Sequence, residues 1–474
     1  MKNVEDVKRL TEVVPHRRQI ALQQTEFYAF FHFGISTYTD REWGTGKEPP
    51  ALFYPEKMDA LSWVKAIKKA GMKGALLTCK HHDGFCLWPS KYTSHTVAFS
   101  PYKNGKGDIV KEVSDACKAE GIKFGVYLSP WDLNNPAYGK GEEYNEYFVN
   151  QLTELLTGYG EIFEVWFDGA CGEGANGKVQ TYDWERYYEV IRRLQPEACI
   201  SVCGPDVRWC GNEGGHTRKA EWSVVPERLS RAEIVKALSQ QEDSEEFRTR
   251  KINSKDEDLG SRQALSGEEA LIWYPSEVDV SIRPGWFYHS AEDDKLRSLE
   301  ELLHIYYSSV GGNSTLLLNI PPTPEGLLAE PDVKLLQEIG NYLENTFADN
   351  LAENAAFYWD LGQGEYQINY EDAKGEGRFF ATQEGTSQGT LLLRWEKPVT
   401  FSHVVLKEYI PMSQRVESYE ILAETDTGLR TVASGETIGY KKILRFEPVT
   451  AEAVRICIKE SRVSIALEFV GVYG

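Results

Sequence analysis

Short apolar runs alternate with amphipathic segments along the first two-thirds of the chain. In one such segment, residues 144–156, six apolar or aromatic side chains recur at helical spacing and share one face. Because strands that alternate with helices form a parallel sheet with right-handed crossovers, about eight repeats predict a (β/α)8-like barrel. The later helical patterns are less regular, so we expect this barrel to be distorted. The apolar runs cover residues 27–34, 74–79, 122–129, 162–167, 198–203, 221–225, 271–275 and 315–320.

An open, doubly wound sheet is the alternative architecture for the same pattern. Such sheets often carry a G-x-G-x-x-G turn directly after the first strand, where a dinucleotide binds. No such turn follows residues 27–34. The closed barrel is therefore the favoured interpretation.

Past about residue 345 the pattern changes from helical to alternating. Segments such as "GTLLLRW" and "SHVVLKEY" alternate apolar and polar residues, and turn residues separate them at roughly regular intervals. This is typical of an antiparallel β-sandwich. We therefore expect a barrel domain over residues 1–345 and a β-sandwich over residues 346–474. The charged stretch 240–260 is expected to be a solvated insertion on the barrel.

Composition and charge narrow the classes of partner. Hydrophobic residues make up 41% and charged residues 26%, the balance of an ordinary globular protein. The net charge is -20 and there is no basic cluster, which argues against nucleic acid or an anionic membrane as a partner. No apolar run approaches the ~18 residues of a membrane span, so no membrane insertion is expected. A neutral substrate remains compatible, and nothing in the sequence indicates an oligomeric state.

Cysteine usage and the N-terminus bear on the compartment. The eight cysteines include no C-x-x-C pair, so a zinc knuckle is not expected, and a chain of this length can fold without disulfides. The first residues contain no apolar core of a signal peptide. The sequence as it stands predicts a cytoplasmic protein, with a periplasmic or secreted location as the alternative if a leader has been removed.

Polar and aromatic residues follow the ends of five consecutive predicted strands. In a (β/α)8 barrel the carboxyl ends of the strands meet at one face, where catalytic groups lie. We therefore expect these side chains to gather around one site. They are His32 after the first strand, His81, His82 and Asp83 after the second, Tyr127, Trp131 and Asp132 at the third, Trp166 and Asp168 at the fourth, and Asp206, Arg208, Trp209 and Glu213 after the fifth.

Two carboxylates in this set suggest a type of reaction, the hydrolysis of a glycosidic bond. Burying a charge such as that of Asp168 at the end of an apolar strand is costly unless the charge is paired or used. Asp168 and Glu213 leave neighbouring strands, and a pair of carboxyl groups across a glycosidic bond is the general solution for glycoside hydrolysis. Aromatic rings suit the apolar face of a sugar, and histidines suit its hydroxyl groups. Phosphate-binding loops are absent, so no cofactor is expected.

Four sequence motifs resemble those of a known enzyme family. The segments "FHFG", "KHHDGF", "VWFDGA" and "NSTLLLNIPPTPEG", in this order over residues 20–345, resemble family 29 α-L-fucosidases. The resemblance implies a retaining exo-hydrolase without a metal, on a barrel followed by a β-sandwich of the galactose-binding-like type. It makes Asp168 of "WFDG" the nucleophile. The segment "GPDVRWCGNEGG" resembles the branch that prefers α-1,3- and α-1,4-linked fucose on branched glycans, and there the resemblance makes Glu213 the acid/base.

The resemblance also implies the contacts to substrate, which is expected to be a fucosylated oligosaccharide or glycoconjugate. We expect the loop of Glu213 to read a branch sugar as well, with hydrogen bonds from Asp206 and Arg208 and a stacking face from Trp209. The pKa of Glu213 is expected to be raised by burial and by the neighbouring carboxylate. The implied fucose-binding residues are His32, His81, His82, Tyr127 and Trp166, with Glu42, Trp43 and Trp286 as further candidates.

Three alternatives to a linkage-selective fucosidase remain. One is a fucosidase of broad specificity. Another is a metal-dependent hydrolase that uses His32, His81, His82, Asp83 and Asp168; adjacent histidines argue against it, since alternate strand residues point to opposite faces, and the H-E-x-x-H motif is absent. The third is a glycan-binding protein without catalysis, which the presence of both carboxylates disfavours.

Overall fold

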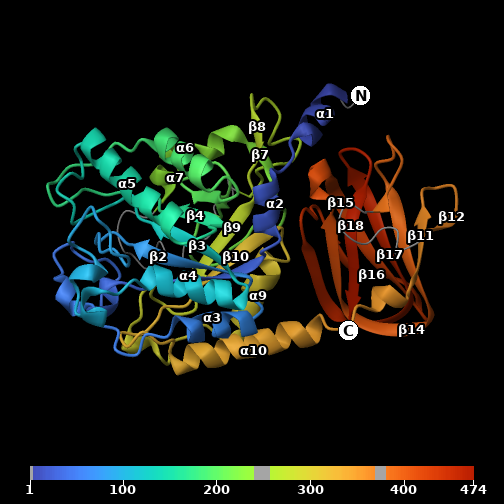
Figure 1. The fold of residues 1–474 in the computed structure, drawn as a ribbon. Helices are drawn as coiled ribbons and strands as arrows, with labels where there is room; N and C mark the ends of the chain where they lie inside the picture. The colour runs from blue at the N-terminus through green and yellow to red at the C-terminus, as the bar shows by residue number, and fades with distance from the viewer. Residues whose placement is uncertain (1–3, 240–256, 369–379) are drawn as a thin grey trace.

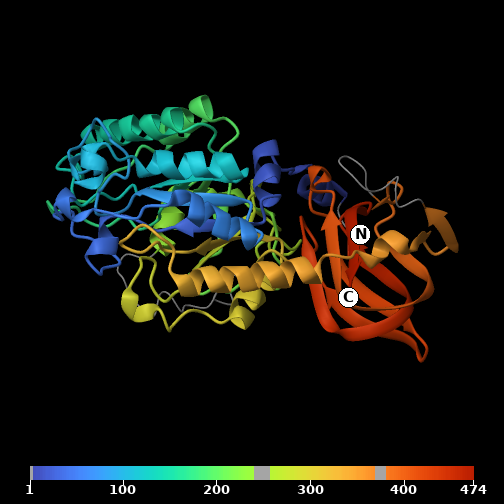
Figure 2. The ribbon, with the colours of Figure 1, turned by 60° about the horizontal axis from the view of Figure 1, so that its bottom comes forward.

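The protein consists of a barrel and a β-sandwich that lie side by side (Figures 1 and 2). The computed structural model describes residues 4–239, 257–368 and 380–474, so most of the charged stretch 240–260 lies outside the described residues. Helix α10 (Glu330–Thr346) runs along the barrel and leads toward the sandwich, whose first strand, β11 (Ala356–Asp360), follows it. Within the described residues, no helix has the length and apolar character needed to cross a membrane.

Eight parallel strands form the barrel, which confirms the predicted fold class. They pair in the order β5-β4-β3-β2-β1-β10-β9-β6, and a bridge between Ser201 and Val207 brings the two edges of the sheet together. An open sheet would leave these edges apart. The strands are β1 (Phe27–Phe31), β2 (Gly74–Lys80), β3 (Lys123–Leu128), β4 (Glu164–Phe167), β5 (Cys199–Val202), β6 (Arg208–Trp209), β9 (Ser276–Ser281) and β10 (Ser314–Asn319).

Helices cover the outside of this barrel, and polar side chains cap several of them. The helix that ends at Glu120, for example, begins after Asp108, whose carboxylate accepts the backbone N–H of Lys111, and Gly121 at φ 69° closes it. Among the described residues, the helices of the chain are α1 (Val4–Glu12), which lies beside the sandwich, α2 (Arg17–Gln23), α3 (Ala60–Lys69), α4 (Ile109–Glu120), α5 (Glu142–Gly158), α6 (Trp184–Leu194), α7 (Ala232–Leu238), α9 (Leu299–Ser309) and α10.

The barrel is distorted in its second half, as expected, but two of the predicted barrel strands are wrong. Residues 221–225 and 271–275 do not join the barrel; they contribute to an antiparallel pair, β7 (Val224–Pro226) with β8 (Leu271–Trp273). The barrel uses β6, which follows β5 without a helix, and β9 instead. Strand β9 reads SEVDVS and turns Glu277 and Asp279 inward, so it carries no apolar run that the pattern could detect.

The second domain is antiparallel, as predicted, and it packs around its own apolar core. Its strands pair in the order β12-β11-β14-β17-β15-β16, and β18 pairs with β13 and β14. The two longest strands change register along their length, so one sheet can wrap over the core. The remaining strands are β12 (Glu365–Ile368), β13 (Phe380–Ala381), β14 (Gly389–Glu408), β15 (Val416–Thr425), β16 (Gly428–Gly435), β17 (Lys442–Ser461) and β18 (Ala466–Tyr473).

Buried charges join the two domains. Glu26, just before β1, accepts hydrogen bonds from Lys407 at 3.1 Å and Lys441 at 3.0 Å in the sandwich, and from Lys73 at 3.2 Å in the barrel. Burial alone would raise the pKa of Glu26, but the three ammonium groups hold it well below its usual range. A charge that is buried and fully paired in this way fixes the two domains relative to one another.

Candidate active site

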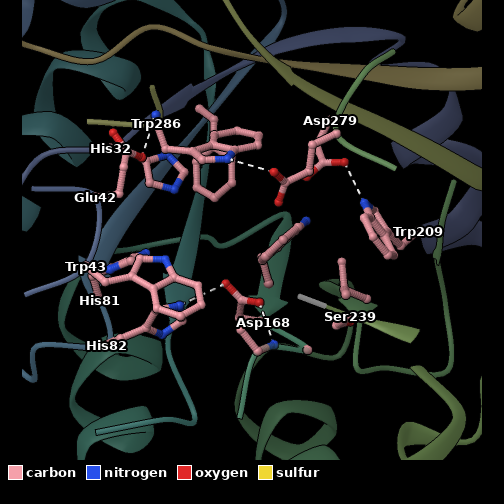
Figure 3. A pocket seen from close by; sticks show the side chains of 16 residues that line it. His32, Glu42, Trp43, His81, His82, Asp168, Trp209, Ser239, Asp279 and Trp286 are labelled. Carbon is pink, nitrogen blue, oxygen red and sulfur yellow. Dashed lines mark hydrogen bonds and ion pairs between the residues drawn. The ribbon is translucent and has the colours of Figure 1, made fainter. Parts of the chain in front are cut away.

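A pocket opens at the carboxyl ends of the barrel strands, where the sequence placed the candidate residues (Figure 3). It has about 640 Å³ of empty volume, part of which is open to solvent. The predicted catalytic and fucose-binding residues all line it except Tyr127, which reaches it through a hydrogen bond to Asp168. The predicted lining residues are His32, Glu42, Trp43, His81, His82, Trp166, Asp168, Trp209, Glu213 and Trp286.

Asp168 stands one residue beyond β4 and is fixed by hydrogen bonds to both oxygens. The Tyr127 hydroxyl donates to Oδ2 at 2.8 Å, and the backbone N–H of Ala170 donates to Oδ1 at 2.8 Å. Among the described residues no Lys or Arg forms an ion pair with it, and the basic side chain that approaches it is His82, whose Nε2 lies 3.7 Å from Oδ2. The side chain keeps 23% of its surface exposed toward the pocket. The carboxylate is therefore oriented by neutral donors while one side stays free to react.

His82 presents a free acceptor nitrogen to the pocket. The Ser129 hydroxyl donates its proton to the carbonyl of Trp131 at 2.8 Å, so it can only accept from His82 Nδ1, 2.7 Å away. In the neutral ring, Nε2 is then the nitrogen without a proton. Burial lowers the pKa of His82, although Asp168 opposes this, so the ring is neutral near pH 7. Its Nε2 can accept a hydrogen bond from a substrate hydroxyl.

The tautomer of His32 is fixed by its hydrogen bonds in the same way. Asn319 donates its amide N–H to the carbonyl of Trp286 at 2.8 Å, which leaves its Oδ1 facing His32 Nδ1 at 2.8 Å. His32 Nδ1 therefore carries the proton, and Nε2 is the acceptor. Burial lowers the pKa of His32 to about 3, and it lowers the pKa of His81 as well. The pocket thus contains three neutral histidines.

Glu213 lies in the loop after β6 and receives a hydrogen bond from the indole N–H of Trp286 at 3.1 Å. The side chain of Asn212 closes the loop, because its Oδ1 accepts the backbone N–H groups of Gly214 and His216, each at 3.0 Å. Glu213 and Asp168 line the same pocket. The loop therefore presents a second carboxyl group to the pocket that holds Asp168.

Glu42 anchors the segment that carries Trp286. Its Oε2 accepts the backbone N–H of Trp286 at 2.8 Å, and its Oε1 lies 2.6 Å from His289 Nε2. The other nitrogen of His289 lies 2.6 Å from Asp40. The hydrogen bond to Glu42 is the largest cause that raises the pKa of His289, to about 9. A protonated His289 therefore clamps two carboxylates, and through Glu42 it fixes the wall of the pocket.

Asp279 is the acidic residue of the pocket that the sequence analysis missed. It is buried on β9 and accepts the indole N–H of Trp209 at 2.6 Å (Figure 3). Burial, with Glu213 and Glu277 nearby, raises its pKa well above the usual range. The alternation of acidic residues in "SEVDVS" was the signal available in the sequence. The other unpredicted lining residues are Phe30, Gly169, Ala170, Val202 and Ser239.

Two expectations about the loop before Glu213 were wrong. Asp206 is buried and forms ion pairs with Arg18 and Arg192, and Arg208 is buried against Glu221. Neither lines the pocket. Both charges are already paired inside the protein, so they cannot read a branch sugar. Trp209 does line the pocket, with its N–H committed to Asp279.

The adjacent histidines do not exclude a metal site in the way that strand alternation predicts. Strand β2 ends at Lys80, so alternation no longer applies to His81 and His82, and both rings face the pocket with centroids 4.1 Å apart. Ligand atoms of His81, His82 and Asp168 lie within 4.8 Å of one another, a group that could hold a cation. Asp83 points elsewhere and accepts the N–H of Phe85 at 2.7 Å.

Similarity to known proteins extends over both domains. The sequence model of the α-L-fucosidase family matches residues 17–346. The chain is 38% identical over 469 residues to α-L-fucosidase 1 of Arabidopsis thaliana, which covers 97% of this chain and 87% of that one. The crystal structure of a provisionally named α-L-fucosidase from Bacteroides ovatus has a TM-score of 0.86 and 47% identity, over 99% of this chain and 76% of that one. A family 29 fucosidase from Ruminococcus gnavus, solved with fucose, has a TM-score of 0.80 and 31% identity, over 98% and 95% of the two chains.

Proposed function

The chain belongs to the α-L-fucosidase family, glycoside hydrolase family 29, and we propose that it cleaves terminal α-1,3- and α-1,4-linked L-fucose from branched oligosaccharides with retention of configuration. Asp168 is the nucleophile in this proposal and Glu213 the acid/base. The observation that carries it is the arrangement of Asp168, whose two oxygens accept hydrogen bonds from Tyr127 and from the N–H of Ala170 in the pocket at the strand ends.

The reaction proceeds in two displacements. Asp168 attacks the anomeric carbon of fucose, and an ester bond forms as the bond to the leaving oxygen breaks. Glu213 gives its proton to that oxygen, so the leaving sugar departs as an alcohol. The ionised Glu213 then takes a proton from water, which attacks the same carbon and releases Asp168.

The walls of the pocket support recognition of a neutral sugar. His32 and His82 present unprotonated Nε2 atoms, which accept hydrogen bonds from hydroxyl groups without adding charge. The rings of Phe30 and Trp166, with centroids 5.4 Å apart, and the ring of Trp286 give an apolar surface for the remaining face. This combination favours a sugar over a charged metabolite.

The proposal for linkage depends on the side of the pocket formed by the loop of Glu213. Trp209 lies on that side with its N–H bonded to Asp279, so its ring rather than its nitrogen is offered to a ligand. A sugar that stacks there would help to place the acid, and remote binding energy would raise the rate of the chemical step. The alternative is a fucosidase of broad specificity.

A panel of fucosylated oligosaccharides tests this proposal. The protein is incubated with α-1,2-, α-1,3- and α-1,4-linked substrates, and released fucose is measured over time. We expect Lewis-type trisaccharides to be hydrolysed much faster than α-1,2-linked fucose. Equal rates would assign the protein to the broad-specificity alternative, and no release from any substrate would contradict the hydrolase itself.

A further inference from the structure

A buried polar network ties the loop of Glu213 to the C-terminal sandwich, and we propose that Gln414 of the sandwich is a positioning residue for the acid/base. The inference rests on the role of Glu213 proposed above. Gln414 holds the backbone at residues 221–223, and Glu221 holds the arginines at the two ends of the loop. The sandwich would thereby take part in catalysis without touching the substrate.

The loop of Glu213 is rich in glycine. Glu213 stands among Gly211, Gly214 and Gly215, and the first and last of these adopt φ values of 103° and 79°. Glycine has the greatest backbone freedom of any residue. The bonds from Asn212 close the turn around Glu213. Trp286 bonds the carboxyl group of Glu213, and the two ends of the loop help to set where the turn lies over the pocket.

Buried ion pairs hold both ends. Glu221 pairs with Arg208, which precedes the loop, and with Arg218, which closes it, at 3.4 Å. Arg218 also donates to the carbonyl of Cys210 at 3.4 Å. All three charged side chains are buried, at 2–8% exposure. Because a buried charge without its partner is strongly unfavourable, these ion pairs oppose separation of the two ends of the loop.

The sandwich sets where this cluster lies. Gln414, which is fully buried between the domains, accepts the backbone N–H of Ser223 at 2.8 Å and donates to the carbonyl of Glu221 at 3.1 Å. Asn313 of the barrel donates to the same carbonyl at 2.9 Å and accepts the N–H of Tyr440 in the sandwich at 2.7 Å. The backbone of Glu221 is thus held from both domains at once.

A small displacement of the acid has a large effect on rate. A misplacement of about 1 Å in a catalytic group can cost about 100-fold. Loss of the two hydrogen bonds of Gln414 would let the cluster and the loop shift while the pocket around Asp168 stays in place. The effect should therefore appear where the leaving group needs a proton, and be small where it does not.

The test uses Gln414→Met, which keeps the side-chain volume and removes both hydrogen bonds. The quantity measured is kcat/KM, which covers the steps up to cleavage of the glycosidic bond, for a Lewis-type trisaccharide and for an aryl fucoside with an acidic leaving group. We expect a loss of about tenfold on the trisaccharide and less than about twofold on the aryl fucoside. His403→Ala is the matched control, since His403 is buried and bonds Tyr307 across the same boundary, at 3.0 Å.

The control variant should lower thermal stability without changing the ratio of the two substrates. An equal loss on both substrates for Gln414→Met, or the same change of ratio in the control, would overturn the inference. If Gln414→Met does not fold, Gln414→Glu, which keeps the bond from Ser223, is measured instead, with the same criterion. Glu213→Ala is measured in parallel. If this variant loses kcat/KM equally on the two substrates, the proposed role of Glu213 is wrong. If Glu213→Ala loses more on the trisaccharide but Gln414→Met does not, only the role of Gln414 is rejected.

Discussion

Protonated His289 should make the stability of the pocket wall depend on pH. The ring lies between Asp40 and Glu42, each 2.6 Å from one nitrogen, with Glu292 also nearby. These contacts raise the pKa of His289 from 6.5 to about 9. Because the folded state binds the proton more tightly than the unfolded chain, the stabilisation is full below pH 6.5. It declines as the pH rises and is lost above about pH 9.

The size of this effect follows from the same contacts. A pKa shift from 6.5 to about 9 corresponds to roughly 3 kcal/mol if the whole interaction counts. Asp40 keeps 84% of its side-chain surface exposed, and solvent screens such pairs strongly. We therefore expect about 1 kcal/mol. The change His289→Gln leaves a side chain that can donate to one carboxylate but carries no charge.

The assay is urea unfolding of the protein and of His289→Gln at pH 6 and pH 10. The free energies of unfolding should differ by about 1 kcal/mol at pH 6 and converge at pH 10. His304→Gln, an exposed histidine on α9, is the control and should show no such trend. A difference that is the same at both pH values would refute the clamp, because it would mean that His289 carries no extra proton in the folded protein.

The remaining predictions concern the reaction. Asp168→Ala should lose turnover of natural substrates and keep its fold. Azide should restore part of its activity on an activated fucoside, and the product should be a fucosyl azide of inverted configuration. Near-normal turnover without azide would reject Asp168 as the nucleophile. Glu213→Ala should lose most activity on oligosaccharides and less on aryl fucosides with acidic leaving groups. Trp209→Ala should narrow the difference between Lewis-type and α-1,2-linked substrates, and an unchanged difference would mean that Trp209 only packs beneath the loop. Treatment with a chelator should leave activity unchanged, and loss with recovery on adding a divalent cation would make His81, His82 and Asp168 a metal site.

The first half of the barrel could be predicted because its strands are buried on both faces. Strands β1 to β5 read as apolar runs, and each matches one predicted run to within a few residues. Their ends could then be placed on one face, which is why His32, His81, His82, Trp166 and Asp168 were found together. The nucleophile position of Asp168 stays a prediction until the variant is measured.

The second half could not be predicted from apolar runs. Strand β6 is two residues long, and β9 turns acidic residues toward the barrel interior. The apolar segments that form β7 and β8 pair with one another outside the barrel. In the sequence they have the pattern of barrel strands, so the pattern predicts them in place of the strands that β6 and β9 provide. As a result Asp279 was missed, and Arg208 was expected in the pocket although it is paired with Glu221 inside the protein.

The inward-facing acidic residue Glu277 on β9 is explained by the buried side chains that donate hydrogen bonds to it. Glu277 accepts hydrogen bonds from the indole N–H of Trp166 at 2.7 Å and from the hydroxyl of Tyr28, while Glu164 accepts one from Ser201. Burial raises the pKa of both carboxyl groups, and the neighbouring Glu277 raises that of Glu164 further, so the two groups resist carrying two charges at once. Trp166 lies two residues before Asp168 on the same inward face. An apolar residue at position 277 would leave the buried indole N–H without a partner, and the ring beneath the pocket would lose the contact that orients it.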